Sequence, residues 1–487
     1  MVYCGKVSKS CKQCRKRDIK CDKKRASCGQ CVRAGIPCPG YSDTTEFVFM
    51  DSTETTIQKS TKQIRAAISK PMQQMAENSA KMYWVARYVL ADASYFDYMK
   101  SFLPRRSHYN HMDAAVYAVG LALFSKEFGV PSMLQEARRK YCSALVLTNR
   151  VLQDASLATD NSTLATVLLL GLFERFTRED PKPREGIGKH MDGAIAIAAV
   201  RGPTQFSDPI GLRIFQQLAA NIVMSCLERD MPIPAKFQAL RAQANLCYNQ
   251  VDSEWRFLDL MMDFIAASVA VDKDEVHAEN LDNFQIIDLR LNGLSETVSS
   301  QILAATSEAT TALSTSWSDC NHRDRLSQLH KNICSARLVL IEKYIELSES
   351  QSPDDDGTSI DQLQEYSSTL EILRLEICRS AQECLLSGRY DGTNPQRSLS
   401  SVDTQRIRPF SIELQNQAKK LMFPLYIAAS TKSCPVATRK WVIDCLSAIT
   451  NKLELSQAAL TKDLIERHEP RNAWSVAATL GAFPLGT

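Results

Sequence analysis

The chain has 487 residues, of which 44% are hydrophobic and 23% charged, and its formal net charge is +3 at pH 7. This length can bury one or two sizeable cores. The longest apolar run, around Val167 to Phe173, is far short of the roughly twenty residues that span a bilayer. We therefore expect no membrane segment and no membrane partner.

Six cysteines near the N-terminus form two copies of the spacing C-x2-C-x6-C, seventeen positions apart: Cys11, Cys14, Cys21, Cys28, Cys31 and Cys38. Thiolates suit zinc, which takes four ligands tetrahedrally at about 2.3 Å per Zn–S bond. Six sulfurs are too many for one such site and too few for two independent ones. The spacing therefore predicts two zinc ions that share two bridging thiolates.

The alternative for these cysteines is a disulfide framework, as in small secreted domains. The first residues, Met1 to Cys4, contain no apolar signal core, and the other ten cysteines are scattered along the chain. We therefore favour metal, and we interpret Cys4 as a spare thiol.

Basic residues are concentrated around the first copy. Between Lys6 and Arg33 there are eleven Lys or Arg against Asp18 and Asp22, a side-chain balance of +9 that two zinc ions on six thiolates lower to +7. Such a density of charge suits a polyanion. A solvated basic face or a nuclear-import tag is the alternative. Because the basic run is tied to a metal scaffold, we predict nucleic-acid binding.

This stretch resembles the fungal binuclear zinc-cluster transcription factors, which carry six cysteines. All six ligand positions match, within Ser10–Asp22, Ser27–Cys31 and Cys38–Tyr41. The resemblance implies that Cys11 and Cys28 are the bridging thiolates. It also implies a regulator of RNA polymerase II promoters in a fungal nucleus. In this family a short helix from the first half of the zinc cluster enters the major groove and reads a CGG-type half-site.

The resemblance assigns base contacts to Arg17 and Asp18, and phosphate contacts to their basic neighbours. The complete predicted set of DNA-contacting residues is Lys9, Lys12, Arg15, Lys16, Arg17, Asp18 and Lys20.

Two residues depart from the family pattern. Asp18 stands where the family usually has a basic residue, and a carboxylate can only accept a hydrogen bond, for example from the amino group of cytosine. Capping of the short helix, or pairing with Lys20 or Arg15, is the alternative role for Asp18. Ala26 stands where the family often has proline, so we expect a looser loop between the two halves.

The sequence predicts three parts: a zinc-cluster module at 8–42, a polar linker at 43–80, and an all-helical regulatory domain at 81–487. Removing the +9 of the module leaves about −6 for the rest of the chain. Within the linker Ile57, Ile64 and Ile68 lie near heptad spacing, but Pro71 ends the pattern after about two heptads. We expect no stable coiled coil here, and homodimerisation stays open.

Beyond Met82 the apolar residues recur at helical spacing. The clearest predicted helices are Ala114 to Phe124, Met133 to Leu152, Leu164 to Phe176, Ile210 to Leu227, Phe257 to Val269, Leu329 to Leu347, Leu363 to Leu386 and Trp441 to Leu455. Gly129 and Pro131 should separate two helices, and Asp160 and Ser162 can cap the helix that begins near Thr163. Loops are expected at 178–186, 351–358 and 388–409.

Part of this region, about 80–234, resembles more weakly the helical regulatory domain that follows the zinc cluster in these fungal proteins. The matching segments are Leu168–Glu174, His190–Ala194, Val200–Gly202, Phe206–Gly211 and Phe215–Leu218. The resemblance implies control of DNA binding through co-regulator proteins or a small ligand.

The sequence offers little for catalysis. His190 with Lys189 and Asp192 is the one grouping that resembles a catalytic cluster, and a lone histidine on a helix is more often structural. His108 and His111 lack an evident third ligand, and no nucleophile, phosphate-binding or dinucleotide motif is present. We predict that the chain is not an enzyme. The alternative to a sequence-specific regulator is a helical interaction hub with the cluster as a non-specific nucleic-acid tether.

Overall fold

The computed structural model describes residues 9–41, 75, 77–90, 96–102, 110–177, 185–248, 252–271, 278–311, 317–350, 360–385, 412–467 and 472–480. These residues form helices and loops without any strand, which confirms the predicted mostly α fold. The chain divides into two compact units, Met1–Gln73 and Gln74–Thr487, which are described separately.

The described part of the first unit holds two five-residue helices, α1 (Lys12–Lys16) and α2 (Gly29–Arg33). Its core is made of cysteine side chains, with Ile19, Ile36 and Tyr41 packed around them. A core this small does not stabilise a fold without metal, because the binding energy of the ligands is also the folding energy of such modules.

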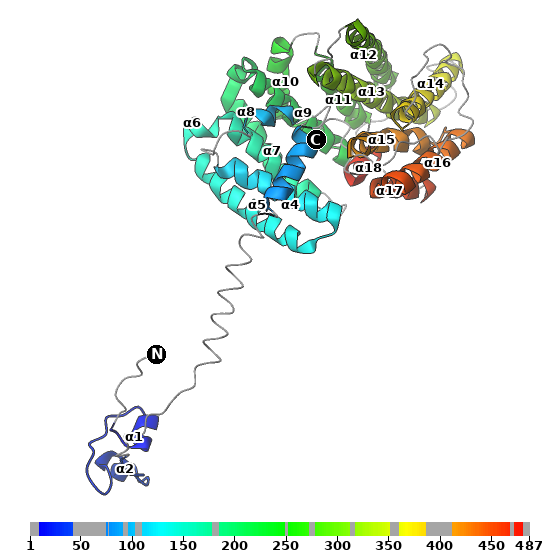
Figure 1. Ribbon diagram of the computed structural model, residues 1–487. Helices are drawn as coiled ribbons and strands as arrows, with labels where there is room; N and C mark the ends of the chain where they lie inside the picture. The colour runs from blue at the N-terminus through cyan, green and yellow to red at the C-terminus, as the bar shows by residue number, and fades with distance from the viewer. Residues whose placement is uncertain are drawn as a thin grey trace. The chain divides into compact units, whose positions relative to one another are not determined.

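The second unit is entirely helical in its described residues (Figure 1). Besides the helical residues 77–84, its elements are η1 (Val85–Val89), η2 (Asp97–Ser101), α4 (Asn110–Phe128), α5 (Pro131–Val151), α6 (Ala155–Ala158), α7 (Asn161–Phe176), α8 (Glu185–Arg201), η3 (Gly202–Phe206), α9 (Pro209–Arg229), α10 (Ala235–Cys247), α11 (Ser253–Val271), α12 (Ala278–Thr311), α13 (Trp317–Ser350), α14 (Ile360–Leu385), α15 (Ile412–Ser430), α16 (Val436–Leu453), α17 (Ser456–Arg467) and α18 (Ala473–Leu480).

The helices of this unit pack mainly against their neighbours in sequence. In the first half α4 contacts α5 and α7, and α7 contacts α8. In the second half α12, α13, α14 and α15 pack in chain order, and α16 and α17 cover α15 (Figure 1). Helix α9 connects the halves, because it contacts α8 on one side and α11 and the C-terminal α18 on the other.

All eight predicted helices are present, and several of their ends follow the expected signals. Gly129, with φ of 64°, ends α4 just before Pro131 begins α5. Asp160 caps α7 and accepts a hydrogen bond from the Ser162 N–H at 3.3 Å. The predicted capping role of Ser162 is wrong, because α7 begins at Asn161 and Ser162 lies within its first turn.

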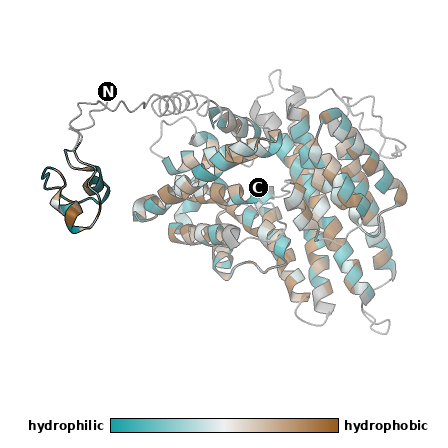
Figure 2. Ribbon diagram, turned by 90° about the horizontal axis from the view of Figure 1, so that it is seen from below, coloured by the Kyte–Doolittle hydropathy of each residue, from teal (hydrophilic) through white to brown (hydrophobic). Residues whose placement is uncertain are grey.

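Helix α9 is apolar over most of its circumference. By length and composition it is the one helix in the described ranges that could cross a membrane, although 78% of its most apolar window is buried inside the unit. Its apolar side chains therefore pack against other helices, as in the core helix of a folded domain. Figure 2 shows hydrophobic and hydrophilic residues alternating around the outer helices, which is the pattern of one buried and one exposed face.

Several predicted connections fall outside the described residues. These are the linker up to 74, with its isoleucines, and the loops at 178–184, 351–358 and 388–409. The predicted loop at 178–186 is too long, since α8 already begins at Glu185.

Residues 77–80, which the sequence placed in the linker, are helical and pack against α4. Ala80 and Trp84 are fully buried, and the Lys140 Nζ lies 2.9 Å from a carboxylate oxygen of Glu77. Gly120 makes this packing close, because a Cβ at this position would stand 2.7 Å from the carbonyl oxygen of Ala80.

We predict that Gly120→Ala lowers the free energy of unfolding by about 1–3 kcal/mol, since the added methyl group must push two backbones apart. The matched control is Gly193→Ala on α8, where a Cβ meets nothing within 4 Å. This control should gain about 0.5–1 kcal/mol, because alanine is the better helix former. Urea unfolding followed by circular dichroism measures both, and equal effects of the two substitutions would contradict the packing.

Candidate metal centre and nucleic-acid interface

The six cysteine sulfurs form two quartets that share two members. All sulfurs of a quartet lie within 4.8 Å of one another. Cys11 and Cys28 belong to both quartets, and the full sets are Cys11, Cys14, Cys21 and Cys28, and Cys11, Cys28, Cys31 and Cys38. This is the arrangement that the resemblance implied for two metals with two bridging thiolates.

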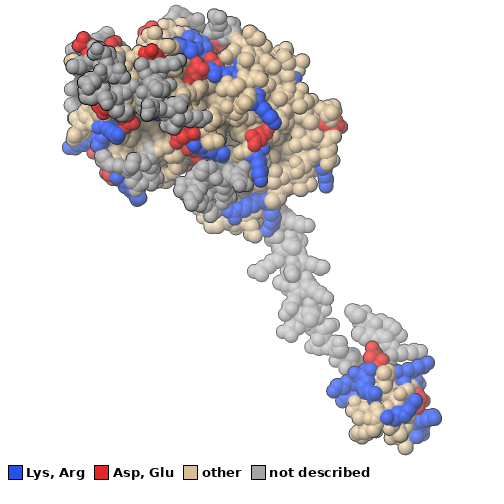
Figure 3. All heavy atoms as spheres, turned by 180° about the vertical axis from the view of Figure 1, so that it is seen from behind, with Lys and Arg blue, Asp and Glu red and all other residues tan. Residues whose placement is uncertain are grey.

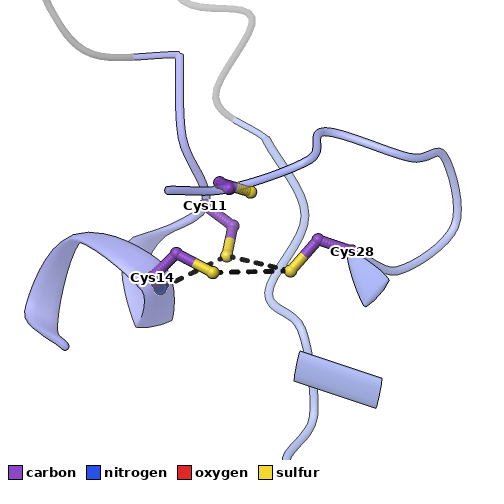
Figure 4. Close-up of side chains that lie close together, drawn as sticks. Cys11, Cys14 and Cys28 are labelled. Carbon is purple, nitrogen blue, oxygen red and sulfur yellow. Dashed lines mark hydrogen bonds between the residues drawn. The ribbon is translucent and has the colours of Figure 1, made fainter. Parts of the chain in front are cut away.

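The sulfur–sulfur distances fit zinc. The Cys11 sulfur lies 3.7 Å from those of Cys28 and Cys31, and the Cys14 sulfur lies 3.5 Å from that of Cys28 (Figure 4). Tetrahedral Zn–S bonds of about 2.3 Å place neighbouring sulfurs roughly 3.8 Å apart, whereas a disulfide holds them at about 2.05 Å. All six cysteines are free thiols. The donor set therefore fits two zinc ions, and the disulfide alternative is wrong.

The two shared cysteines also begin the two helices. Cys11 is the N-cap of α1 and its sulfur accepts the Cys14 N–H at 3.4 Å, while Cys28 is the N-cap of α2 and accepts the Cys31 N–H at 3.4 Å. Cys11 and Cys28 thus each belong to both sulfur quartets and also begin a helix.

Helix α1 ends in a Schellman motif, in which a left-handed residue reverses the chain. The N–H of Asp18, with φ of 50°, donates to the Arg15 carbonyl at 3.2 Å, and the N–H of Ile19 donates to the Cys14 carbonyl at 3.1 Å. The side chain of Ile19 then packs against the sulfurs.

Helix α2 ends in the same way, with Gly35 and Ile36 at the positions that match Asp18 and Ile19. Asp18 therefore has a structural role that belongs to its main chain. Its carboxylate is exposed and, within the described part of the chain, forms no ion pair with Arg15 or Lys20. The side chain is therefore available to a ligand.

Three further contacts close the module, and the sequence analysis did not find them. Both carboxylate oxygens of Asp22 accept the Gly29 N–H at 3.0 Å, and a Cβ on Gly29 would stand 2.6 Å from one of these oxygens. The hydroxyl of Tyr41 donates to the Lys24 carbonyl at 2.7 Å. The N–H of Cys28 donates to the Cys38 sulfur at 3.5 Å.

The loop between the two halves has a left-handed backbone at Ala26. This residue adopts φ of 58°, and Lys23 in the same loop adopts φ of 59°. Proline is fixed near −65° and cannot take this conformation. The absence of proline therefore permits this loop path, and the looser loop stays a prediction.

Burial sets the protonation of several thiols. It raises the pKa of Cys31 to about 12 and raises that of Cys14 as well. A main-chain hydrogen bond from Cys11 instead lowers the pKa of Cys21 to about 7. Zinc must displace protons from the buried thiols, so zinc affinity falls as the pH is lowered.

The predicted DNA-contacting side chains all lie on the surface. The exposed residues are Lys9, Lys12, Arg15, Lys16, Arg17, Asp18 and Lys20. Lys12, Arg15 and Lys16 share one face of α1, opposite the buried Cys14, because residues three and four apart are neighbours on a helix. Figure 3 shows Lys and Arg gathered on this module. Helix α2 exposes Val32 and only one basic side chain, Arg33.

In the structure, the His190 side chain contacts Tyr141 and Glu174 rather than forming a cluster with Lys189 and Asp192. The Nε2 of His190 lies 2.9 Å from the Tyr141 hydroxyl and 3.3 Å from a carboxylate oxygen of Glu174. These contacts tie α8 to α5 and α7. His111 is buried in α4, and His108 lies outside the described residues.

We predict that Ala26→Gly preserves or strengthens zinc binding, because glycine adopts positive φ without the roughly 1–2 kcal/mol that it costs other residues. Ala26→Pro should weaken zinc binding, since the ring forbids φ of 58°. Competition with a coloured chelator measures both affinities. Equal zinc affinity of the proline variant and the unchanged protein would contradict the loop conformation.

Comparison with protein-family models matches residues 9–46 to the fungal Zn(2)-Cys(6) binuclear cluster domain. A search of curated proteins and a search of solved structures each found no match. The matched family is a domain of transcription factors rather than of enzymes; it binds two zinc ions and DNA, and its proteins are generally nuclear. With its six cysteines gathered around two shared sulfurs, the N-terminal unit belongs to the fungal Zn(2)-Cys(6) binuclear cluster family, and the chain is a zinc protein of the DNA-binding transcription-regulator kind.

Proposed function

We propose that the chain is a sequence-specific regulator of RNA polymerase II promoters in a fungal nucleus, and that its zinc cluster reads a short CGG-like half-site. The observation that carries this proposal is the exposed basic face of α1. Lys12, Arg15 and Lys16 project away from the metal core, and no described acidic residue pairs with them. Cations held in this way are available to phosphates.

The dimensions of α1 suit the major groove. Five residues span about 7.5 Å, and the groove is about 12 Å wide. We assign Lys9, Lys12, Arg15, Lys16 and Lys20 to the DNA backbone, where they fix the position of the module without reading sequence. The C-terminal end of the helix then faces the bases.

Arg17 and Asp18 are the proposed base readers. Arginine donates two hydrogen bonds to guanine, whereas aspartate accepts one from the amino group of cytosine. Adjacent side chains of this kind suit adjacent guanine and cytosine, as a CGG-like half-site provides. Asp18 can take this role because only its main chain is used in the helix cap.

We assign residues 8–42 to DNA binding, the segment from 43 to the start of the helical unit to a linker, and the helical unit, which includes residues 77–80, to regulation through co-regulator proteins. Homodimerisation is part of this proposal and would be visible as a pair of half-sites in the bound DNA. The proposal contains no catalytic step.

The proposal is tested by selection from a random DNA pool with the zinc-loaded full chain at two salt concentrations. We expect one enriched half-site at both. Asp18→Lys should change the preferred bases within this site by about 1–3 kcal/mol of discrimination, because a donor replaces an acceptor. The matched control, Arg33→Ala on α2, should leave the preferred sequence unchanged.

Two outcomes count against the proposal. An unchanged preference in Asp18→Lys would assign this carboxylate to a purely structural role. No enriched sequence, with binding that vanishes as the salt concentration rises, would identify the cluster as a non-specific tether.

We also predict that Cys14→Ala abolishes DNA binding while the helical unit stays folded. The substitution removes a buried ligand from one quartet, and the two units have separate cores. Gel-shift titration and far-ultraviolet circular dichroism report the two properties. DNA binding that survives the loss of zinc would refute the metal-scaffold argument.

A further inference from the structure

A second group of metal-binding side chains lies in the helical unit. His330 and Cys334 are four residues apart on α13 and so share one face, and Glu376 comes from α14, which packs against α13. The ligand atoms of the three residues all lie within 4.8 Å of one another. Apart from the N-terminal quartets, this is the one such mixed group among the residues that the structure describes.

The distances within this group match those around a tetrahedral zinc ion. The Cys334 sulfur lies 3.8 Å from the His330 Nδ1 and 3.4 Å from the Glu376 Oε2. Zinc bonds of about 2.3 Å to sulfur and about 2.0–2.1 Å to nitrogen or oxygen place neighbouring ligand atoms roughly 3.5 Å apart. The two distances from the Cys334 sulfur are thus close to those of a zinc site, and the His330 and Glu376 ligand atoms lie within 4.8 Å of each other.

Among the salt bridges of the described residues, none involves Glu376. Arg337, one turn along α13 from Cys334, lies 2.7 Å from the Asp288 carboxylate and 2.6 Å from the Asn292 side chain. The Arg337 guanidinium therefore pairs with side chains of α12 rather than with Glu376 on α14.

The protonation of the group agrees with metal binding. The unperturbed pKa of histidine is about 6.5, so an imidazole is mostly neutral at pH 7, which is the form that binds metals. The Cys334 thiol donates a hydrogen bond to the Glu376 Oε2, and a bound metal would take the place of this proton. A thiolate and a carboxylate together balance the charge of Zn²⁺.

We propose that His330, Cys334 and Glu376 bind a third zinc ion, which joins α13 to α14 in the helical unit. The mixture of sulfur, nitrogen and oxygen donors suits zinc better than magnesium or calcium. Cys334 is 1% exposed, whereas the other two ligands are only half-buried, so the ion can enter from their side. A water molecule completes the coordination, as in other three-ligand zinc sites.

The first test is the zinc content of the full chain, measured by mass spectrometry after dialysis against metal-free buffer. We expect three zinc ions per chain, and two in His330→Gln and in Glu376→Ala. Both substitutions are at half-buried positions and should leave the unit folded, which circular dichroism verifies. In Cys14→Ala the third ion should persist, because its ligands lie in the other unit.

Two matched controls lie on the same helices. His322→Ala changes an exposed histidine of α13, and Cys378→Ala changes a fully buried cysteine of α14 that is not a member of the group. Both controls should retain three zinc ions. X-ray absorption at zinc gives an independent readout, because the N-terminal cluster supplies only sulfur, so nitrogen and oxygen neighbours must come from another site.

Two zinc ions in the unchanged protein, with sulfur neighbours alone, would overturn the proposal. Three zinc ions in both His330→Gln and Glu376→Ala would also overturn it, since the third ion would then be bound elsewhere. Neither result would affect the assignment of the DNA-binding module.

Discussion

The N-terminal unit depends on two sulfurs that serve two metal sites at once. Cys11 and Cys28 belong to both quartets and also cap both helices, so loss of either would remove metal ligands and helix starts together. No apolar core compensates, because the interior consists of sulfur and a few flanking side chains. Zinc binding therefore stabilises the fold of this unit, whereas hydrophobic burial stabilises the fold of the helical unit.

Because the cysteine side chains form the interior, the other side chains of the module are available on its surface. Both halves share one backbone design, with a cysteine N-cap, a single helical turn and a left-handed residue followed by isoleucine. They differ in what they expose, since α1 carries the basic face and α2 is nearly neutral. The same backbone design thus presents one basic surface and one nearly neutral surface.

The sequence predicted the metal centre well because its ligands are close in the chain, so their spacing alone constrains the geometry. Helix positions in the second unit followed from apolar periodicity, while their ends depended on caps such as Asp160. The left-handed Ala26 was not predicted, since alanine rarely adopts that conformation. Glu376 is 42 residues from Cys334, and only the packing of α14 on α13 brings them together, so a search for paired histidines missed this group.

The left-handed backbone at position 18 also restricts which residues can stand there. Positions 12, 15, 16 and 17 tolerate many side chains, because they are exposed and lie in or beside an ordinary helical turn. At position 18, valine, isoleucine and threonine are penalised by steric clash, and proline is forbidden. Substitution at this exposed position is therefore easiest for glycine, asparagine and other residues without a branched Cβ, so the cap of α1 narrows the variation open to this part of the module surface.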